Sequence, residues 1–134
     1  MKYEYLGYAG ATPFVAAATA LMLGFFPSAT ANALVFYSVI ILSFLGGVHW
    51  GVALVGSDDG VSNRFTFAIL PSLAAWAVFL MPFEAAFVHL AFCFLAFWLV
   101  ERYLYKISSR YQRLRNILTA IVISALTIAF IAFL

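Results

Sequence analysis

The sequence predicts an all-α integral membrane protein: a single bundle of five transmembrane helices, with the N-terminus in the cytoplasm and the C-terminus outside. Hydrophobic residues make up 66% of the 134 residues and charged residues only 9%, whereas a soluble domain is roughly a quarter charged. Five apolar segments are each long enough to cross a bilayer at about 1.5 Å per residue. All seven Lys and Arg residues fall on one side of a five-span topology. The positive-inside rule places that side in the cytoplasm or a mitochondrial matrix.

The first predicted span covers residues 6–26. A secretory signal peptide is the competing interpretation, because Lys2 precedes the apolar run and Ala29-Thr30-Ala31 resembles a cleavage site. The run is longer than the usual core of roughly 7 to 15 residues in a signal peptide. We therefore expect a transmembrane helix.

The remaining elements follow with short links, which favours one domain over residues 1–134. Residues 27–32 predict an uncharged turn, residues 56–64 a turn-rich polar loop, and Pro82 and Glu84 a tight turn. The segment 101–115 is basic. Between these links we expect spans at residues 33–55, 65–83, 85–103 and 116–134.

The segment 43–51 in the second span carries glycines and a histidine inside an apolar helix. Glycine is a weak helix former, so its presence there needs a reason. Small residues at a spacing of four let another helix backbone approach closely. We expect this packing role, against the first span with its Gly7 and Ala11, for Ser43, Gly46, Gly47 and Gly51.

The imidazole of His49 needs a partner inside the membrane, which makes it a candidate site residue. Residue counting places it at the level of Pro13 and Pro71, and each proline frees a backbone carbonyl in its own helix. This predicts a polar pocket in the inner half of the membrane, lined by His49, Trp50, Ser72 and Trp76. A structural hydrogen bond and proton handling remain alternatives for His49. Alternatively, the prolines only bend their helices and the Ser and Thr side chains bond back to their own backbones.

Catalysis is not predicted. His49 and His89 lie on the order of 15 Å apart in depth, too far to share one metal or haem iron. The acidic residues, Glu101 included, are expected at the interfaces, so no carboxylate pair lies within the membrane. No Cys/His spacing for zinc is present, Cys93 is expected to be core filler, and any cofactor is unknown.

The segment 101–115 alternates basic residues with tyrosines, which suits a position beside anionic lipid headgroups. Each basic residue there contributes on the order of 1 kcal/mol. A docking surface for a cytoplasmic partner is the alternative, and nucleic-acid binding is disfavoured because the segment is short and close to the bilayer. The candidate membrane-surface residues are Arg102, Lys106, Arg110, Arg113 and Arg115.

Three stretches resemble one family along nearly the whole chain. They are Ile41-Leu42-Ser43-Phe44-Leu45-Gly46-Gly47-Val48-His49-Trp50-Gly51, Leu70-Pro71-Ser72-Leu73-Ala74-Ala75-Trp76 and Tyr111-Gln112-Arg113-Leu114-Arg115-Asn116-Ile117-Leu118-Thr119. Their order and spacing are similar to the domain-of-unknown-function family 3429, the transmembrane protein 69-like small multispanning membrane proteins. Relatives often have an aspartate after the fourth span, where this chain has Glu101. The resemblance implies a multi-pass protein of the bacterial inner (cytoplasmic) membrane, or of the mitochondrial inner membrane in a eukaryote, and implies no activity.

Three functional hypotheses follow. The first is a non-enzymatic interaction or assembly partner within the bilayer, acting on another membrane protein or on a second copy of itself. The second is a binder of an amphipathic small molecule, such as a quinone, tetrapyrrole or lipid, around His49. The third, a small transporter or proton pathway, is least favoured because His49 is expected to have no carboxylate partner inside the membrane.

Overall fold

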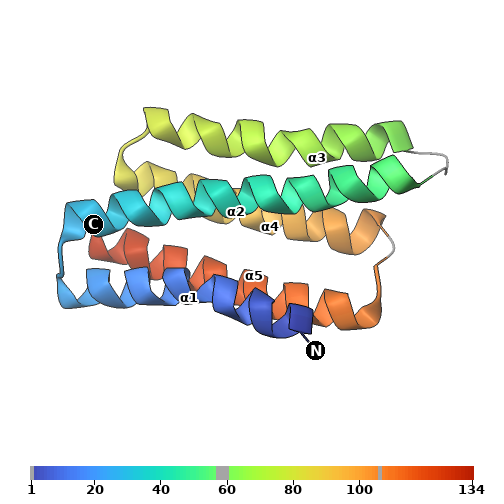
Figure 1. The fold of residues 1–134 in the computed structure, drawn as a ribbon. Coiled ribbons are helices and arrows are strands. Elements are labelled where there is room, and N and C mark those ends of the chain that lie inside the picture. The colour runs from blue at the N-terminus through green and yellow to red at the C-terminus, as the bar shows by residue number, and fades with distance from the viewer. Residues whose placement is uncertain (1, 57–60, 106) are drawn as a thin grey trace.

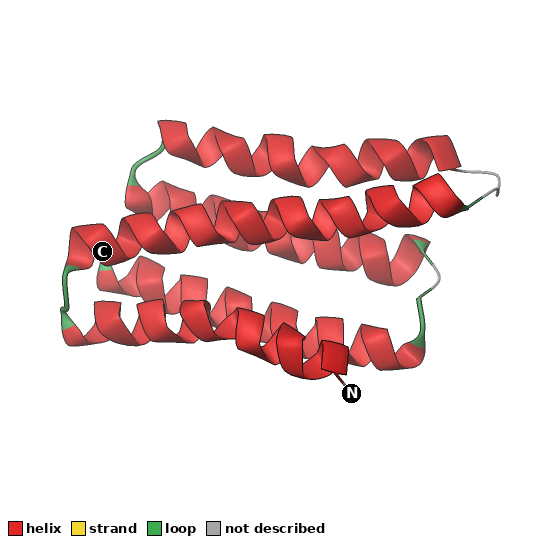
Figure 2. Cartoon of the chain, in the orientation of Figure 1, coloured by secondary structure: helices red, strands yellow, loops and turns green. Residues whose placement is uncertain are grey.

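The computed structural model describes residues 2–56, 61–105 and 107–134. This part of the chain forms long helices and no strands (Figures 1 and 2). A short 3-10 helix, η1, continues the third α-helix. The elements are α1 (Lys2–Leu23), α2 (Pro27–Val55), α3 (Val61–Trp76), η1 (Ala77–Leu80), α4 (Phe83–Leu104) and α5 (Ser109–Ala132). Five helical segments are long and apolar enough to cross a membrane. The predicted five-helix membrane fold is therefore confirmed.

All five helices begin earlier in the chain than the predicted spans, and the difference is largest for α2 and α5. Residues 27–32 form the first turns of α2 instead of a loop, because Pro27 occupies an initial helical position where its fixed φ is favourable. The preceding turn is tight, with Gly24 and Phe26 at positive φ. α5 begins at Ser109, where the hydroxyl of Ser108 accepts the backbone N–H of Tyr111 as an N-cap. Most of the basic segment therefore lies inside a helix.

The helices run up and down the bundle in chain order (Figure 1). α2 packs mainly on α3 and α1 mainly on α5, while α4 contacts α5, α2 and α3. The start of α1, the end of α2 with the start of α3, and the end of α4 with the start of α5 lie at one end, which we call the basic end, and the C-terminus lies at the opposite end. The basic residues with described side chains all belong to helix turns or links at the basic end: Arg64, Arg102, Arg110, Arg113 and Arg115.

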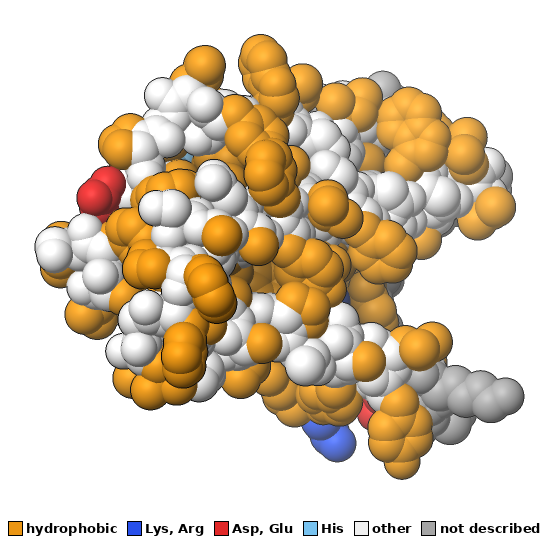
Figure 3. Space-filling view, turned by 60° about the vertical axis from the view of Figure 1, so that its left-hand side comes forward, with side chains coloured by type: hydrophobic (Ala, Val, Ile, Leu, Met, Phe, Trp, Pro, Cys, Tyr) orange, Lys and Arg blue, Asp and Glu red, His pale blue; other side chains and the backbone are white. Residues whose placement is uncertain are grey.

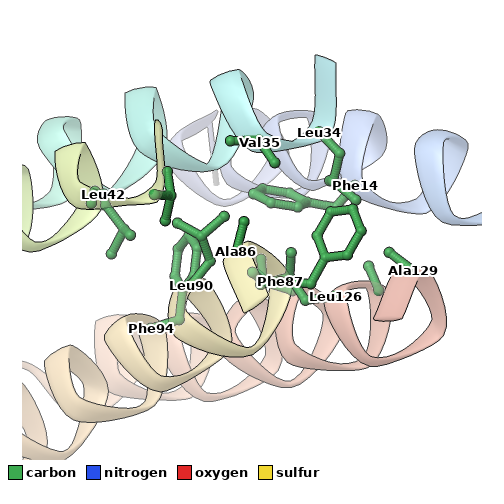
Figure 4. Close-up of a cluster of buried hydrophobic side chains, with 14 of the residues drawn as sticks. Phe14, Leu34, Val35, Leu42, Ala86, Phe87, Leu90, Phe94, Leu126 and Ala129 are labelled. Carbon is green, nitrogen blue, oxygen red and sulfur yellow. The ribbon is translucent and has the colours of Figure 1, made fainter. Parts of the chain in front are cut away.

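An apolar core fills the half of the bundle toward the opposite end. Figure 4 shows side chains from α1, α2, α4 and α5 converging there. Phe14 of α1 meets Tyr37 and Phe94 edge-on, with ring centroids 5.1 and 5.9 Å apart. On the face that Figure 3 shows, most of the surface is hydrophobic and few charged side chains are visible. Such a surface suits a lipid bilayer environment.

Only one glycine of the small-residue segment makes a close helix contact. A Cβ on Gly46 would collide with the carbonyl oxygen of Ala68 on α3, so glycine is required where these helices meet. A Cβ on Gly47 or Gly51 would meet nothing within 4 Å. The contact is therefore with α3, and the expectation of packing against α1 is wrong, because Gly7 of α1 faces α5 instead.

Candidate ligand-binding site

The basic half of the core contains charged side chains that bond to one another. His49 of α2 and Glu101 of α4 are each only 1% exposed, and His49 Nε2 lies 2.8 Å from Glu101 Oε2. Arg115 of α5 is 4% exposed, and its Nε donates to Glu101 Oε1 over 2.7 Å. Both carboxylate oxygens of Glu101 therefore have a partner.

Arg64 of α3 fixes the protonation of His49. Its Nε and Nη2 lie 3.1 and 2.8 Å from His49 Nδ1. A guanidinium has only donors, so Nδ1 must accept, and the ring proton must sit on Nε2 and be donated to Glu101. His49 is therefore neutral in this arrangement. We call His49, Arg64, Glu101 and Arg115 the charge cluster.

Aromatic rings pack around the charge cluster. Phe67 and Phe97 meet the His49 ring with centroids 5.1 and 5.5 Å away. The Arg64 guanidinium lies 4.4 Å from the centre of the Tyr105 ring, a cation–π contact. Ion pairs in such surroundings are weakly screened, so breaking one costs far more than at a surface.

The charge cluster contains more positive charge than negative. Arg64 and Arg115 carry two positive charges, Glu101 carries one negative charge, and His49 is neutral. Within the described residues, no carboxylate lies within 4 Å of Arg64. Arg115 Nη2 and Thr119 Oγ1 are the buried side-chain atoms of the described part that lack a hydrogen-bond partner. Such an unsatisfied buried donor costs about 1–3 kcal/mol.

A cavity of about 740 Å³ lies over the charge cluster, between α1, α2 and α5. Tyr37 on α2 ties the two helices together by donating to the Gly10 carbonyl of α1 over 2.6 Å. Beyond this tie the helices diverge toward the basic end (Figure 1), and Figure 3 shows the resulting opening as a notch between two lobes. Its polar lining residues include His49, Arg64, Arg115, Ser108 and Tyr111, and its apolar wall includes Leu6, Phe44, Val48, Val52, Leu114 and Leu118.

The structure does not gather the four predicted pocket residues around this cavity. Trp50 is 41% exposed and packs on Phe65, with ring centroids 4.6 Å apart, because one residue along the helix turns it about 100° away from His49. Trp76 is 64% exposed and Ser72 is half-buried on α3. Of the four, only His49 lines the cavity.

Sequence reasoning missed the partners of His49. The expectation that Glu101 lies at an interface is wrong: α4 continues to Leu104 and turns Glu101 into the core. Arg115, expected on the membrane surface, is likewise buried because α5 starts at Ser109. The argument against proton handling, that His49 lacks a carboxylate partner in the membrane, therefore does not hold.

The rest of the basic segment lies differently. Arg102, Arg110 and Arg113 are exposed, with Arg110 Nε 2.7 Å from Glu4 Oε1, whereas Lys106 lies outside the described residues. His89 is separate from the charge cluster: its Nε2 lies 2.7 Å from the carbonyl oxygen of Ala74. No three His, Cys, Asp or Glu side chains of the described residues are grouped so as to hold a metal ion.

Comparisons with known proteins place the chain in a family but assign it no chemistry. It is 39% identical over 79 residues to "Transmembrane protein 69" of Xenopus tropicalis, an alignment that covers 57% of this chain and 31% of that protein. The chain thus spans about a third of the length of this relative. No solved structure matches. The family model described as "Protein of unknown function (DUF3429)" matches residues 2–131, and this multi-pass membrane protein therefore belongs to that family.

Proposed function

We propose that this protein binds an amphipathic small molecule in the cavity between α1, α2 and α5. The polar head lies against the charge cluster and the apolar tail lies between α1 and α2. The observation that carries this proposal is the combination of a cavity of about 740 Å³ and an apolar wall with a polar floor formed by His49, Arg64 and Arg115.

The size and lining of the cavity support a ligand of this kind. Small-molecule sites usually measure about 300–1,000 Å³ and combine apolar walls with a few polar groups. Ionisable residues within membrane spans mark functional sites by default, because they are costly to keep there. Here three of them, His49, Arg64 and Arg115, line the same cavity. A quinone, a tetrapyrrole or a lipid has the required polar head and apolar body.

The test is native mass spectrometry of protein extracted gently from its own membrane. Val48→Trp fills the cavity wall, and Val55→Trp places the same side chain on the same helix at an exposed residue outside the lining of this cavity. A defined small adduct on the wild type and Val55→Trp that is lost in Val48→Trp supports the proposal. An adduct that survives in Val48→Trp, or none on the wild type, contradicts it.

We further propose an orientation with the basic end in the cytoplasm of a bacterium, or in the matrix of a mitochondrion, with the protein in the inner membrane. The clustering of Arg residues at that end supports this under the positive-inside rule. Reporter fusions at Asp59 and at Leu134 should report opposite sides, with the Asp59 fusion inside. A cytoplasmic signal from the Leu134 fusion would refute the orientation.

A second candidate function is non-enzymatic assembly with a membrane partner or a second copy of this chain. Gly47 and Gly51 support it, because both face open space on α2 and would admit another helix closely. Gly47→Leu should then abolish co-purification of the partner, or the dimer, while the bundle stays folded. An unchanged set of bound proteins and an unchanged oligomeric state would argue against it.

A further inference from the structure

The geometry points to an anionic headgroup: the cavity takes a single-tailed amphiphile whose head is a carboxylate or phosphate bound between Arg64 and Arg115. This inference rests on the proposed function and specifies the chemical class of its ligand. It does not follow from the size or apolar wall of the cavity, which would accept a neutral quinone equally well.

The first argument is the charge of the site. Two guanidiniums face one carboxylate, since the bonds from Arg64 to Nδ1 keep His49 neutral. One positive charge is left without a counter-ion among the described residues. Arg115 is buried and Arg64 is half-buried, so this excess charge is only partly hydrated, and one bound anion would make the site neutral.

The second argument is the set of donors. Arg115 Nη2 is buried without a partner, while Nε of the same guanidinium is held by Glu101. Nε and Nη2 of Arg64 donate to the neutral ring of His49, and Arg64 has no carboxylate partner in the described part of the chain. Both residues line the cavity. Guanidiniums are well suited to the oxygens of carboxylates and phosphates, with which they form short charge-assisted hydrogen bonds.

The third argument is the position of the site in the membrane. His49 lies six residues before the end of α2 at Val55, or about 9 Å along the helix. An acidic head at this depth leaves its tail directed away from the basic end, along the apolar lining residues Gly7, Phe44 and Leu118. The volume of about 740 Å³ accommodates a single chain there.

The experiment compares three probes that differ in one feature each. The purified protein, in nanodiscs of zwitterionic lipid, is titrated with a pyrene-labelled long-chain fatty acid, with the methyl ester of that acid, and with acetate as a head without a tail. A mildly alkaline buffer keeps the acid ionised. We expect the acid to bind at least about tenfold more tightly than the ester, the usual effect of a charge-assisted hydrogen bond. Acetate alone should compete weakly.

Matched variants test the assigned residues. Arg64→Gln removes the excess charge and should abolish the preference for acid over ester, whereas Arg64→Lys should keep much of it. Arg102→Gln removes one charge from an exposed position at the same end and should change nothing. Arg64 is the residue to replace because, unlike Arg115, it holds no buried carboxylate, so the variant should still fold.

The outcomes separate the two proposals. Equal binding of acid and ester, both abolished by Val48→Trp, refutes the anionic headgroup and leaves the cavity as a ligand site. Binding of neither probe counts against both. Tight binding of acetate that competes fully with the acid would show a site for free anions and would overturn the single-tailed amphiphile. An equal loss of acid preference in Arg64→Gln and Arg102→Gln would reduce the effect to general surface charge.

Discussion

The two halves of the bundle core have opposite kinds of side chain, apolar in one and charged in the other, on the same buried helix faces. On α4, Phe87, Leu90 and Phe94 follow one buried stripe, and Glu101 continues it at the basic end. α5 repeats the pattern, with Leu126 and Ala129 at the apolar end and Arg115 at the charged end. Figure 4 shows hydrophobic side chains of the apolar half packed against one another.

This difference determines how each half stabilises the fold. In a bilayer the lipid tails are as apolar as the core, so burial of Phe or Leu gains mainly van der Waals packing. In the charged half, each hydrogen bond or ion pair keeps a charged group from being left unpaired in a medium of low dielectric. We therefore expect the charged half to be more sensitive to substitution, although it holds fewer side chains.

The largest effect should come from Glu101→Ala, which strands Arg115 and removes the acceptor of His49. Loss of one partner of a buried ion pair costs about 3–5 kcal/mol. The apparent unfolding midpoint in a neutral detergent, followed by circular dichroism, should fall sharply. Glu84→Ala, at the other end of α4, is the control, and equal midpoints for the two variants would remove the distinction between the halves.

We expect the second-largest effect from Gly46→Ala. Overpacking against the Ala68 carbonyl should lower the free energy of unfolding by up to about 3 kcal/mol. Gly47→Ala adds the same methyl group where nothing lies within 4 Å and should gain up to about 1 kcal/mol from helix propensity. The two variants are compared in the same unfolding assay. Similar midpoints would mean that α2 and α3 do not approach as described.

Phe94→Ala probes the apolar half. The substitution leaves a void of roughly 100 Å³. At about 24 cal/mol per Å³ this lowers the free energy of unfolding by roughly 2 kcal/mol, which is less than the loss expected for Glu101→Ala. Phe92→Ala removes the same ring from a lipid-facing position and should be nearly neutral. A Phe94 variant less stable than Glu101→Ala would reverse the ranking of the two halves.

We expect the smallest shift of the unfolding midpoint for Arg110→Ala. Arg110 and Glu4 form an ion pair of the same 2.7 Å length as Arg115 and Glu101, but their side chains are 53% and 27% exposed. Solvent screening limits an exposed pair to about 1 kcal/mol or less. A midpoint shift comparable to that of Glu101→Ala would show that burial does not separate the two pairs.

The fold was largely predictable because each span is a long apolar run, and the basic residues fix which ends lie together. Helix starts were not: Pro27 and Ser108 begin helices within segments whose polar composition suggested links. The spacing of residues 87, 90, 94, 97 and 101 places Glu101 on the buried face of α4, a pattern that outweighs its charge.

The candidate site was predicted only at His49. Its other members come from three further helices, and no rule of spacing links Arg64 or Arg115 to a histidine on α2. Trp50 and Trp76 were chosen by depth along their helices, whereas the direction of a side chain around the helix decides whether it reaches a cavity. Depth can be counted from a sequence, but rotation requires knowing which helices are neighbours.

The pairing of α1 with α5 has a consequence for biosynthesis. Within this bundle, α1 is translated before the other helices and α5 after them, so one wall of the cavity is made before the other. Until α5 arrives, Glu101 lacks Arg115, and the cavity does not exist. Insertion of α5 thus completes the bundle, supplies Arg115 as the partner of Glu101 and forms the cavity in one step.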